Sequence, residues 1–147
     1  IFFFFLHISL FVVFPLFFRS LSEVVIGYAI VLAVTGTVTS FVFQLAHVVE
    51  ITEMVDATEE ITHDEIHQLK TTANFATNNK FLSWYVGGLN FQREHHLYYK
   101  ISHVHYPEIN LAVKKVCDAL NLPQNEYPTL MSATKSHIRY LKVMGKQ

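Results

Sequence analysis

The chain has too few cysteines for a protein stabilised by disulfides and too little net charge for a typical nucleic-acid-binding protein. Its single cysteine, Cys117, excludes an internal disulfide framework. Its formal net charge of −1 gives no strong positive field, so nucleic acid is not expected as a partner. Acidic and basic residues are missing altogether from residues 1–18 and 24–49. Charge is therefore absent over stretches long enough to lie in a membrane.

These two uncharged segments contain much of an apolar fraction that reaches 51% of the chain. A membrane span needs about 20 residues, which both segments approach or exceed. Only residues 19–23 separate them, so we predict a transmembrane helical hairpin made of residues 1–18 and 24–49. Because the chain opens at Ile1, inside the first apolar run, we expect the natural protein to extend upstream.

The remaining residues, 50–147, contain 10 of the 11 lysines and arginines, and the positive-inside tendency puts them on the cytoplasmic side. We predict a cytoplasmic helical cap there, and hence an all-α membrane protein fragment with domains at 1–49 and 50–147. Asn110 is a candidate helix cap. The expected elements of the cap are three helices and a short interfacial or re-entrant element, at residues 50–70, 110–120, 129–143 and 81–97 respectively.

Histidine is unusually frequent, with nine residues against 11 lysines and arginines, which is a first sign of metal chemistry. The densest cluster includes Gln92, His95 and His96. On a helix Gln92 would share a face with one or both histidines, because they follow it by three and four residues. Neutral imidazole suits iron, zinc and copper, and the Gln92 amide could bind metal weakly or hold a metal-bound water. The alternative is an inert surface pair of histidines.

A second candidate group, Gln44 and His47, lies at the end of the second apolar segment. Counting about 20 residues from Val24 exhausts the hydrocarbon thickness near Phe43. His47 then emerges on the same side as residues 50–147, within reach of the other histidines. Polar residues in membrane spans are functional candidates, although a histidine that reaches toward the headgroups would fit equally well.

Three other histidine patterns carry weaker signals. His103 and His105 alternate, so an extended segment would point both to one side, where they could orient ligands or contact a substrate head group. A polar turn fixed by proline is the alternative. The pair His63 and His67 is rejected as a zinc motif, because the glutamate stands two places after the first histidine rather than one. His7, inside the first apolar segment, is expected to hydrogen-bond a neighbouring helix.

Four stretches together closely resemble the end of membrane fatty-acid desaturases, most of all the bacterial acyl-CoA and front-end type. They are residues 71–77, Trp84, residues 87–97 and residues 103–107. That family carries three histidine boxes, of which the third is usually HxxHH and in front-end enzymes QxxHH. Residues 92–96, QREHH, match the front-end form.

The resemblance implies a helical membrane fold with a cytoplasmic cap and two irons held mainly by histidines. His95 and His96 would be iron ligands, Gln92 would occupy the variable first position, and His47 would be the additional ligand at the end of the last span. Supporting contacts to the ligands or the substrate are expected from four further residues, namely Gln44, Asn90, His103 and His105. The first two boxes are expected upstream of Ile1, so this fragment alone is expected to be inactive.

The implied reaction introduces a double bond into a fatty-acyl substrate, either acyl-CoA or acyl lipid, with O₂ and electrons from an external donor of the cytochrome-b or ferredoxin type. A related membrane di-iron lipid hydroxylase would share the ligands. A non-enzymatic membrane metal-binding or transport module is a third reading. Transport would favour polar residues through the depth of both spans, whereas here they gather mostly at one end.

Overall fold

The computed structural model describes residues 1–53 and 64–146, and these residues are mostly helical. The chain divides into two compact units, Ile1–Ser40 and Phe41–Gln147. One long helix, α2 (Leu21–His47), begins in the first unit and contributes its last turns to the second. The boundary predicted at 49/50 marks the end of the apolar run. The boundary between the two compact units falls earlier, after Ser40, because later residues pack against the end of α2.

The first unit begins with an apolar segment whose helix changes character along its length. It consists of α1 (Phe2–Ile8), a π-helical turn (Ser9–Val13) and a 3₁₀ turn (Pro15–Phe17). Proline has no N–H and its ring crowds the preceding turn, so a π-helical widening just before Pro15 relieves that crowding. The Phe14 N–H accordingly bonds the Ser9 carbonyl at 2.8 Å.

The helix α2 starts at a capping box that the sequence contains as Ser20-Leu21-Ser22-Glu23. The Ser20 N–H and hydroxyl both donate to the Glu23 carboxylate, at 3.0 and 2.9 Å. Within the described residues, α2 is the one helix long and apolar enough to cross a membrane. Its 27 residues span about 40 Å at 1.5 Å per residue. The predicted membrane hairpin stays a prediction, because the first segment is shorter than such a span.

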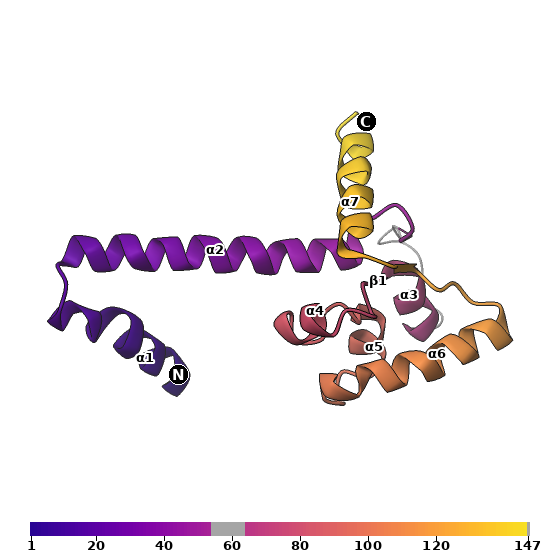
Figure 1. Cartoon of the computed structure of the whole chain (residues 1–147), viewed down its shortest axis with the longest axis horizontal. Coiled ribbons are helices and arrows are strands. Elements are labelled where there is room, and N and C mark those ends of the chain that lie inside the picture. The colour runs from indigo at the N-terminus through magenta and orange to yellow at the C-terminus, as the bar shows by residue number, and fades with distance from the viewer. Residues whose placement is uncertain (54–63, 147) are drawn as a thin grey trace. The chain divides into compact units, whose positions relative to one another are not determined.

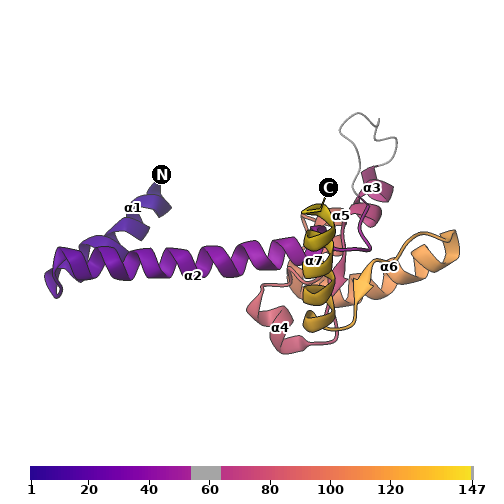
Figure 2. The ribbon, with the colours of Figure 1, turned by 90° about the horizontal axis from the view of Figure 1, so that it is seen from above.

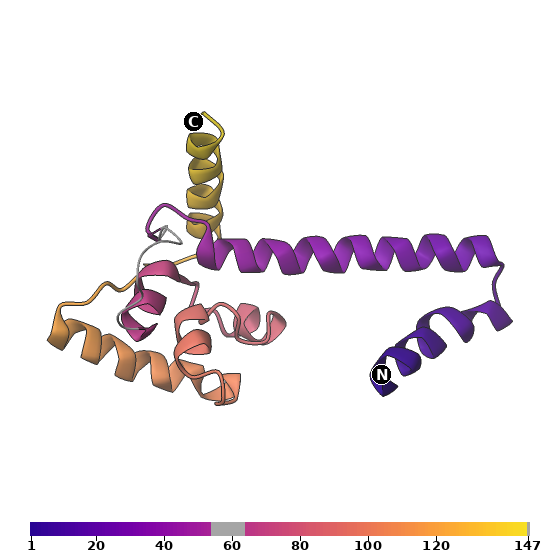
Figure 3. The ribbon, with the colours of Figure 1, turned by 180° about the vertical axis from the view of Figure 1, so that it is seen from behind.

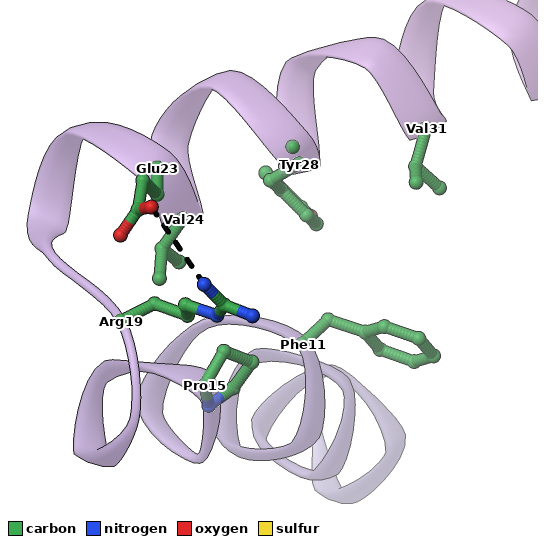
Figure 4. A pocket seen from close by; sticks show the side chains of 8 residues that line it. Phe11, Pro15, Arg19, Glu23, Val24, Tyr28 and Val31 are labelled. Atoms are coloured by element: carbon green, nitrogen blue, oxygen red, sulfur yellow. Dashed lines mark ion pairs between the residues drawn. The ribbon is translucent and has the colours of Figure 1, made fainter.

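A groove of about 220 Å³ runs between the first segment and the start of α2 (Figure 4). Phe11, Pro15 and Tyr28 line its apolar part, and the Arg19–Glu23 ion pair, 3.8 Å between nitrogen and oxygen, lies at one end. Nearby, His7 Nε2 lies 3.0 Å from the Tyr28 hydroxyl, so His7 bonds a neighbouring helix as expected.

The second unit surrounds the last turns of α2 with short elements (Figure 1). In chain order these are α3 (Asp64–Thr71), β1 (Asn74–Phe75), α4 (Lys80–Tyr85), α5 (Gln92–Leu97), a 3₁₀ turn (His103–His105), α6 (Tyr106–Leu120), β2 (Glu126–Tyr127) and α7 (Leu130–Met144). Strands β1 and β2 pair in parallel, Asn74 with Glu126 and Phe75 with Tyr127. The all-α prediction therefore holds only coarsely. The two strands could not be predicted, because two residues are too few to show an alternating pattern.

Two apolar clusters hold this unit together. The larger one joins the end of α2 to β1 and α7 through Val42, Leu45, Ala46, Phe75, Ala76 and Ala133. In both Figure 1 and Figure 2, α7 crosses the end of α2. The smaller cluster, Leu69, Val113 and Cys117, packs α3 against α6. Helix α5 contacts both α3 and α6 (Figure 3). The cap is thus anchored directly on the end of the apolar helix.

Several expected boundaries are wrong. Of the predicted helix over 50–70, residues 50–53 form a turn instead, residues 64–70 are helical as expected, and residues 54–63 lie outside the described residues. The predicted cap Asn110 lies buried inside α6, which starts at Tyr106. Pro107 stands in the first turn of α6, where a missing N–H costs nothing. Residues 103–105 form a 3₁₀ turn rather than an extended segment.

The last predicted helix agrees with the structure to within one residue. Thr129 caps α7 in a reciprocal pair with Ser132, since each residue's backbone N–H bonds the other's side-chain hydroxyl.

Candidate metal centre

The short helix α5 carries Gln92, His95 and His96, and a buried polar network fixes its first turn. The Arg93 N–H donates to Asn74 Oδ1 at 3.0 Å. The Glu94 carboxylate accepts from Asn74 Nδ2 at 2.7 Å, from Asn110 Nδ2 at 3.0 Å and from Arg93 Nε at 3.0 Å. Arg93 and Glu94 are completely buried. Helix α5 is therefore tied to β1 on one side and to α6 on the other.

Two glycines shape the loop that leads into α5. Gly87 and Gly88 have φ of 60° and 77°, in the left-handed region that side chains disfavour. A Cβ at Gly88 would lie 2.7 Å from the Cβ of His103. Glycine is therefore required here both by the backbone angle and by the close approach of His103.

Two predicted site residues, His47 and His96, meet at the side-chain amide of a third, Gln92. Its Nε2 lies 3.2 Å from His47 Nε2 and 3.1 Å from His96 Nε2. The His47 and His96 ring centres are 5.2 Å apart, and those of His95 and His96 are 5.6 Å apart. The structure thus brings together the four residues expected to converge, from the end of α2 and from α5. Their role as metal ligands stays a prediction.

In two of these rings, those of His47 and His95, the Nδ1 nitrogen already has a hydrogen-bond partner. His47 Nδ1 lies 3.4 Å from the Thr71 carbonyl oxygen. Because a carbonyl only accepts, His47 donates from Nδ1 and its Nε2 keeps a free lone pair. His95 Nδ1 lies 3.2 Å from the Tyr106 hydroxyl, and its Nε2 has no hydrogen-bond partner among the residues that the structure describes. Metal-binding histidines commonly anchor the second ring nitrogen in this way.

The electrostatic surroundings favour neutral groups at this site. Burial, with the nearby rings of His47 and His95, lowers the pKa of His96, and Asp64 opposes that shift. A neutral imidazole has the lone pair that a metal requires. Burial and the Glu94 carboxylate raise the pKa of the Tyr106 phenol, so its hydroxyl stays protonated beside His95.

The donor chemistry suits iron as part of a larger ligand set. In the described portion of the chain, no three His, Cys, Asp or Glu side chains are grouped closely enough to hold a metal ion by themselves. The Gln92 side-chain oxygen is buried and has no hydrogen-bond partner there. The amide nitrogen of the same side chain lies beside the Nε2 atoms of His47 and His96. Two imidazole nitrogens and an unpartnered amide oxygen are donors that iron accepts, as zinc and copper also would.

The other predicted residues lie elsewhere. Gln44 is exposed on α2. Asn90 is buried and donates to the Ser83 hydroxyl at 2.9 Å, so it supports the turn before α5. His103 and His105 are exposed on the 3₁₀ turn, and no side-chain hydrogen bond joins them to the histidine cluster within the described residues. Of the two histidines rejected as a zinc motif, His67 lies on α3 and His63 is outside the described residues.

Sequence reasoning missed the residues that orient the rings. Tyr106 and the Thr71 carbonyl reach the site from other elements, and no spacing rule connects them to the histidine box. His137 was also missed: it is buried on α7 and its Nδ1 lies 2.7 Å from the Val48 carbonyl, where it fastens α7 to the end of α2.

Comparison with known proteins bears directly on the family. The model of the family described as "Fatty acid desaturase" matches residues 1–128. The sn-1 linoleoyl-lipid 6-desaturases of Synechocystis sp. and Arthrospira platensis are 44% and 42% identical over 86% and 84% of the chain. The acyl-lipid (8-3)-desaturase of Physcomitrium patens is 37% identical over 76% of it. No solved structure matches.

These matches cover only part of each relative. The chain spans 36% of the Synechocystis protein, 34% of the Arthrospira protein and 24% of the Physcomitrium protein. The matches nevertheless extend over most of the present chain and include the QxxHH box, so the resemblance expected from that box is confirmed. The chain belongs to the fatty acid desaturase family.

Proposed function

We propose that this chain supplies the third histidine box and the cap of a membrane-bound acyl-lipid desaturase. His47, His95 and His96 are ligands of a two-iron centre, and Gln92 is a further ligand or holds a metal-bound water. The observation that carries the proposal is the meeting of His47 Nε2 and His96 Nε2 at the Gln92 amide. Family membership supports it, and the names of the relatives favour an acyl lipid over acyl-CoA as substrate.

The chain's own residues contribute binding and orientation. Bound iron, with O₂, would supply the oxidant that removes two hydrogens from an unactivated methylene pair, which no side chain can do alone. The Thr71 carbonyl holds His47 in the tautomer that presents Nε2, and the Tyr106 hydroxyl orients His95. The buried Glu94 network keeps α5 in register with α6 while the site works. Other ligands would come from the rest of the protein, and electrons from a donor of the cytochrome-b or ferredoxin type.

The proposed arrangement has a defined membrane topology. Residues 1–18 and α2 form a hairpin, and residues 50–147 lie on the cytoplasmic side with the histidine box. Cysteines introduced at Arg19 and Lys142 should therefore react with a membrane-impermeant maleimide from opposite sides. Labelling of both from the same side would contradict the hairpin.

The ligand assignment is tested in the full-length protein by product formation from fed fatty acids, with protein abundance and iron content measured in parallel. We expect His47→Ala, His95→Ala and His96→Ala each to abolish desaturation and to lower bound iron, because each removes an imidazole from the metal. His63→Ala, in a motif already rejected on its spacing, is the matched control and should keep most of the activity. Normal activity of His96→Ala at equal abundance would refute the assignment.

A subtler variant probes Gln92. Gln92→His restores the commoner HxxHH form, so iron should still bind. The changed donor should alter activity, because the position lies against both His47 and His96. Unchanged activity with full iron content would mean that Gln92 has no role at the metal.

A further inference from the structure

The short helix α4 is packed on the end of the membrane-spanning helix. Leu82 of α4, with Val86 and Leu89 just after it, packs against the cluster that includes Val42 and Leu45 of α2. Helix α2 is about 40 Å long, whereas the hydrocarbon core of a bilayer is about 30 Å thick. In the proposed topology the extra length projects at the His47 end, so the last turns of α2 reach the headgroup region and α4 lies at that depth with them.

The outer face of α4 is made of large aromatic side chains. Phe81, Trp84 and Tyr85 are 73%, 75% and 61% exposed. Their rings lie together, with centres 6.0 Å apart for Phe81–Trp84 and 6.5 Å for Phe81–Tyr85. Tryptophan and tyrosine gather where membrane meets water, since their rings are apolar and their tips are polar. This face suits a lipid interface better than bulk water.

A cavity of about 580 Å³ opens beside the same helix. Its walls come from α4, the 3₁₀ turn and α6, with Trp84, Val104 and Leu111 among the apolar side chains. Such a volume is within the usual range for small-molecule sites, about 300–1,000 Å³. The cavity is large enough for a lipid headgroup.

The charge around this cavity is positive. Lys80 and Lys114 both line it. The Lys114 ammonium lies 2.6 Å from the Glu126 carboxylate, which neutralises it. Lys80 makes no ion pair with any residue that the structure describes. The Lys80 ammonium, beside the apolar walls of the cavity, therefore favours an anion that is joined to an apolar group.

We propose that this cavity binds the anionic headgroup of a membrane lipid while Phe81, Trp84 and Tyr85 insert into the bilayer interface. The Lys80 ammonium attracts the phosphate, and Trp84 and Leu111 contact the glycerol and the first methylenes. His47, Gln92, His95 and His96 are not among its lining residues, although Phe91, which precedes Gln92, and His103 are. A free phosphate would gain the charge contact without the apolar one.

Trp84 is the only tryptophan in these 147 residues, so its fluorescence reports on the site. The chain would be placed in nanodiscs that contain a small fraction of lipid brominated near the headgroup end of its acyl chains, as phosphatidylcholine or as phosphatidylglycerol. Bromine quenches a nearby tryptophan. We expect quenching by both lipids, with an apparent affinity about fivefold higher for phosphatidylglycerol, the effect of one lysine at a membrane surface.

Three variants sharpen the test, each checked for helix content by circular dichroism. Lys80→Gln should remove the preference, and Leu111→Glu should also remove it, because the new carboxylate on this exposed wall residue balances the Lys80 ammonium. Lys115→Gln, the same charge change next to Lys114 but outside the cavity lining, should keep the preference. His96→Ala should also keep it, which separates this proposal from the proposed function.

Other outcomes would overturn the proposal. Absence of quenching would show that α4 lies away from the interface. Equal quenching by the two lipids, or a preference that survives Lys80→Gln, would remove the headgroup site. Loss of the preference on adding inorganic phosphate, at matched ionic strength, would show that the cavity binds a bare anion instead of a lipid.

Discussion

Replacing Glu94 by alanine should destabilise the cap more than any other single change near the histidine box. Glu94 is completely buried and accepts hydrogen bonds from Asn74, Asn110 and Arg93. Glu94→Ala leaves all three donors without an acceptor, and it leaves the Arg93 guanidinium charged in the interior.

The expected cost follows from what is left behind. Removing one partner of a buried ion pair costs about 3–5 kcal/mol. Domains are stable by only about 5–15 kcal/mol, so Glu94→Ala should lower the apparent Tm on the order of 10–20 °C. The double variant Arg93→Met/Glu94→Gln removes both charges and should recover most of the loss. Two Arg93 nitrogens, Nη1 and Nη2, have no hydrogen-bond partner among the described residues, so little is lost with them.

The assay is thermal unfolding in detergent, followed by circular dichroism at one fixed scan rate for wild type, Glu94→Ala, Arg93→Met, Glu94→Gln and the double variant. The difference between the double variant and the sum of Arg93→Met and Glu94→Gln measures the coupling of the pair. A double variant as unstable as Glu94→Ala would refute the reasoning. So would a Glu94→Ala protein that melts like the wild type.

Three further outcomes are expected. Tyr106→Phe should reduce iron affinity about 10–100-fold at unchanged helix content, because His95 loses its anchor. Cys117 should resist maleimide until the protein unfolds, since burial shields the thiol and raises its pKa. The Arg139 guanidinium lowers the pKa of Glu50, so the stability from this contact is complete above pH 4.5 and is lost as pH falls through the lowered value; amide exchange in α7 should then quicken.

The sequence predicted the features that depend on local pattern. The uncharged run over residues 24–49 located α2 to within a few residues, because burial in lipid demands a continuous apolar helix. Spacings of three and four residues correctly predicted that Gln92 shares a face with a histidine. The point at which α2 leaves the apolar region also predicted that His47 would lie near the box.

Features set by the path of the chain could not be predicted from the sequence. Asn74 and Asn110 reach Glu94 from β1 and α6, and nothing local distinguishes them from surface asparagines. The alternation of His103 and His105 suggested an extended segment, but Pro107 favours a helix start, and the two histidines fall in the turn before it. Such contacts depend on tertiary packing, which overrides local preference.

The pairing of β1 with β2 has a consequence for the order in which the protein is made. Every residue of α4, α5 and α6 lies between the two strands in the chain. During synthesis, Asn74 and Phe75 have no partner until Glu126 and Tyr127 have left the ribosome. In the topology proposed above, α2 enters the bilayer well before that moment, so His47 reaches the membrane surface before α5 can pack beside it. A ribosome stalled between α6 and β2 would expose an unfinished histidine box to proteases.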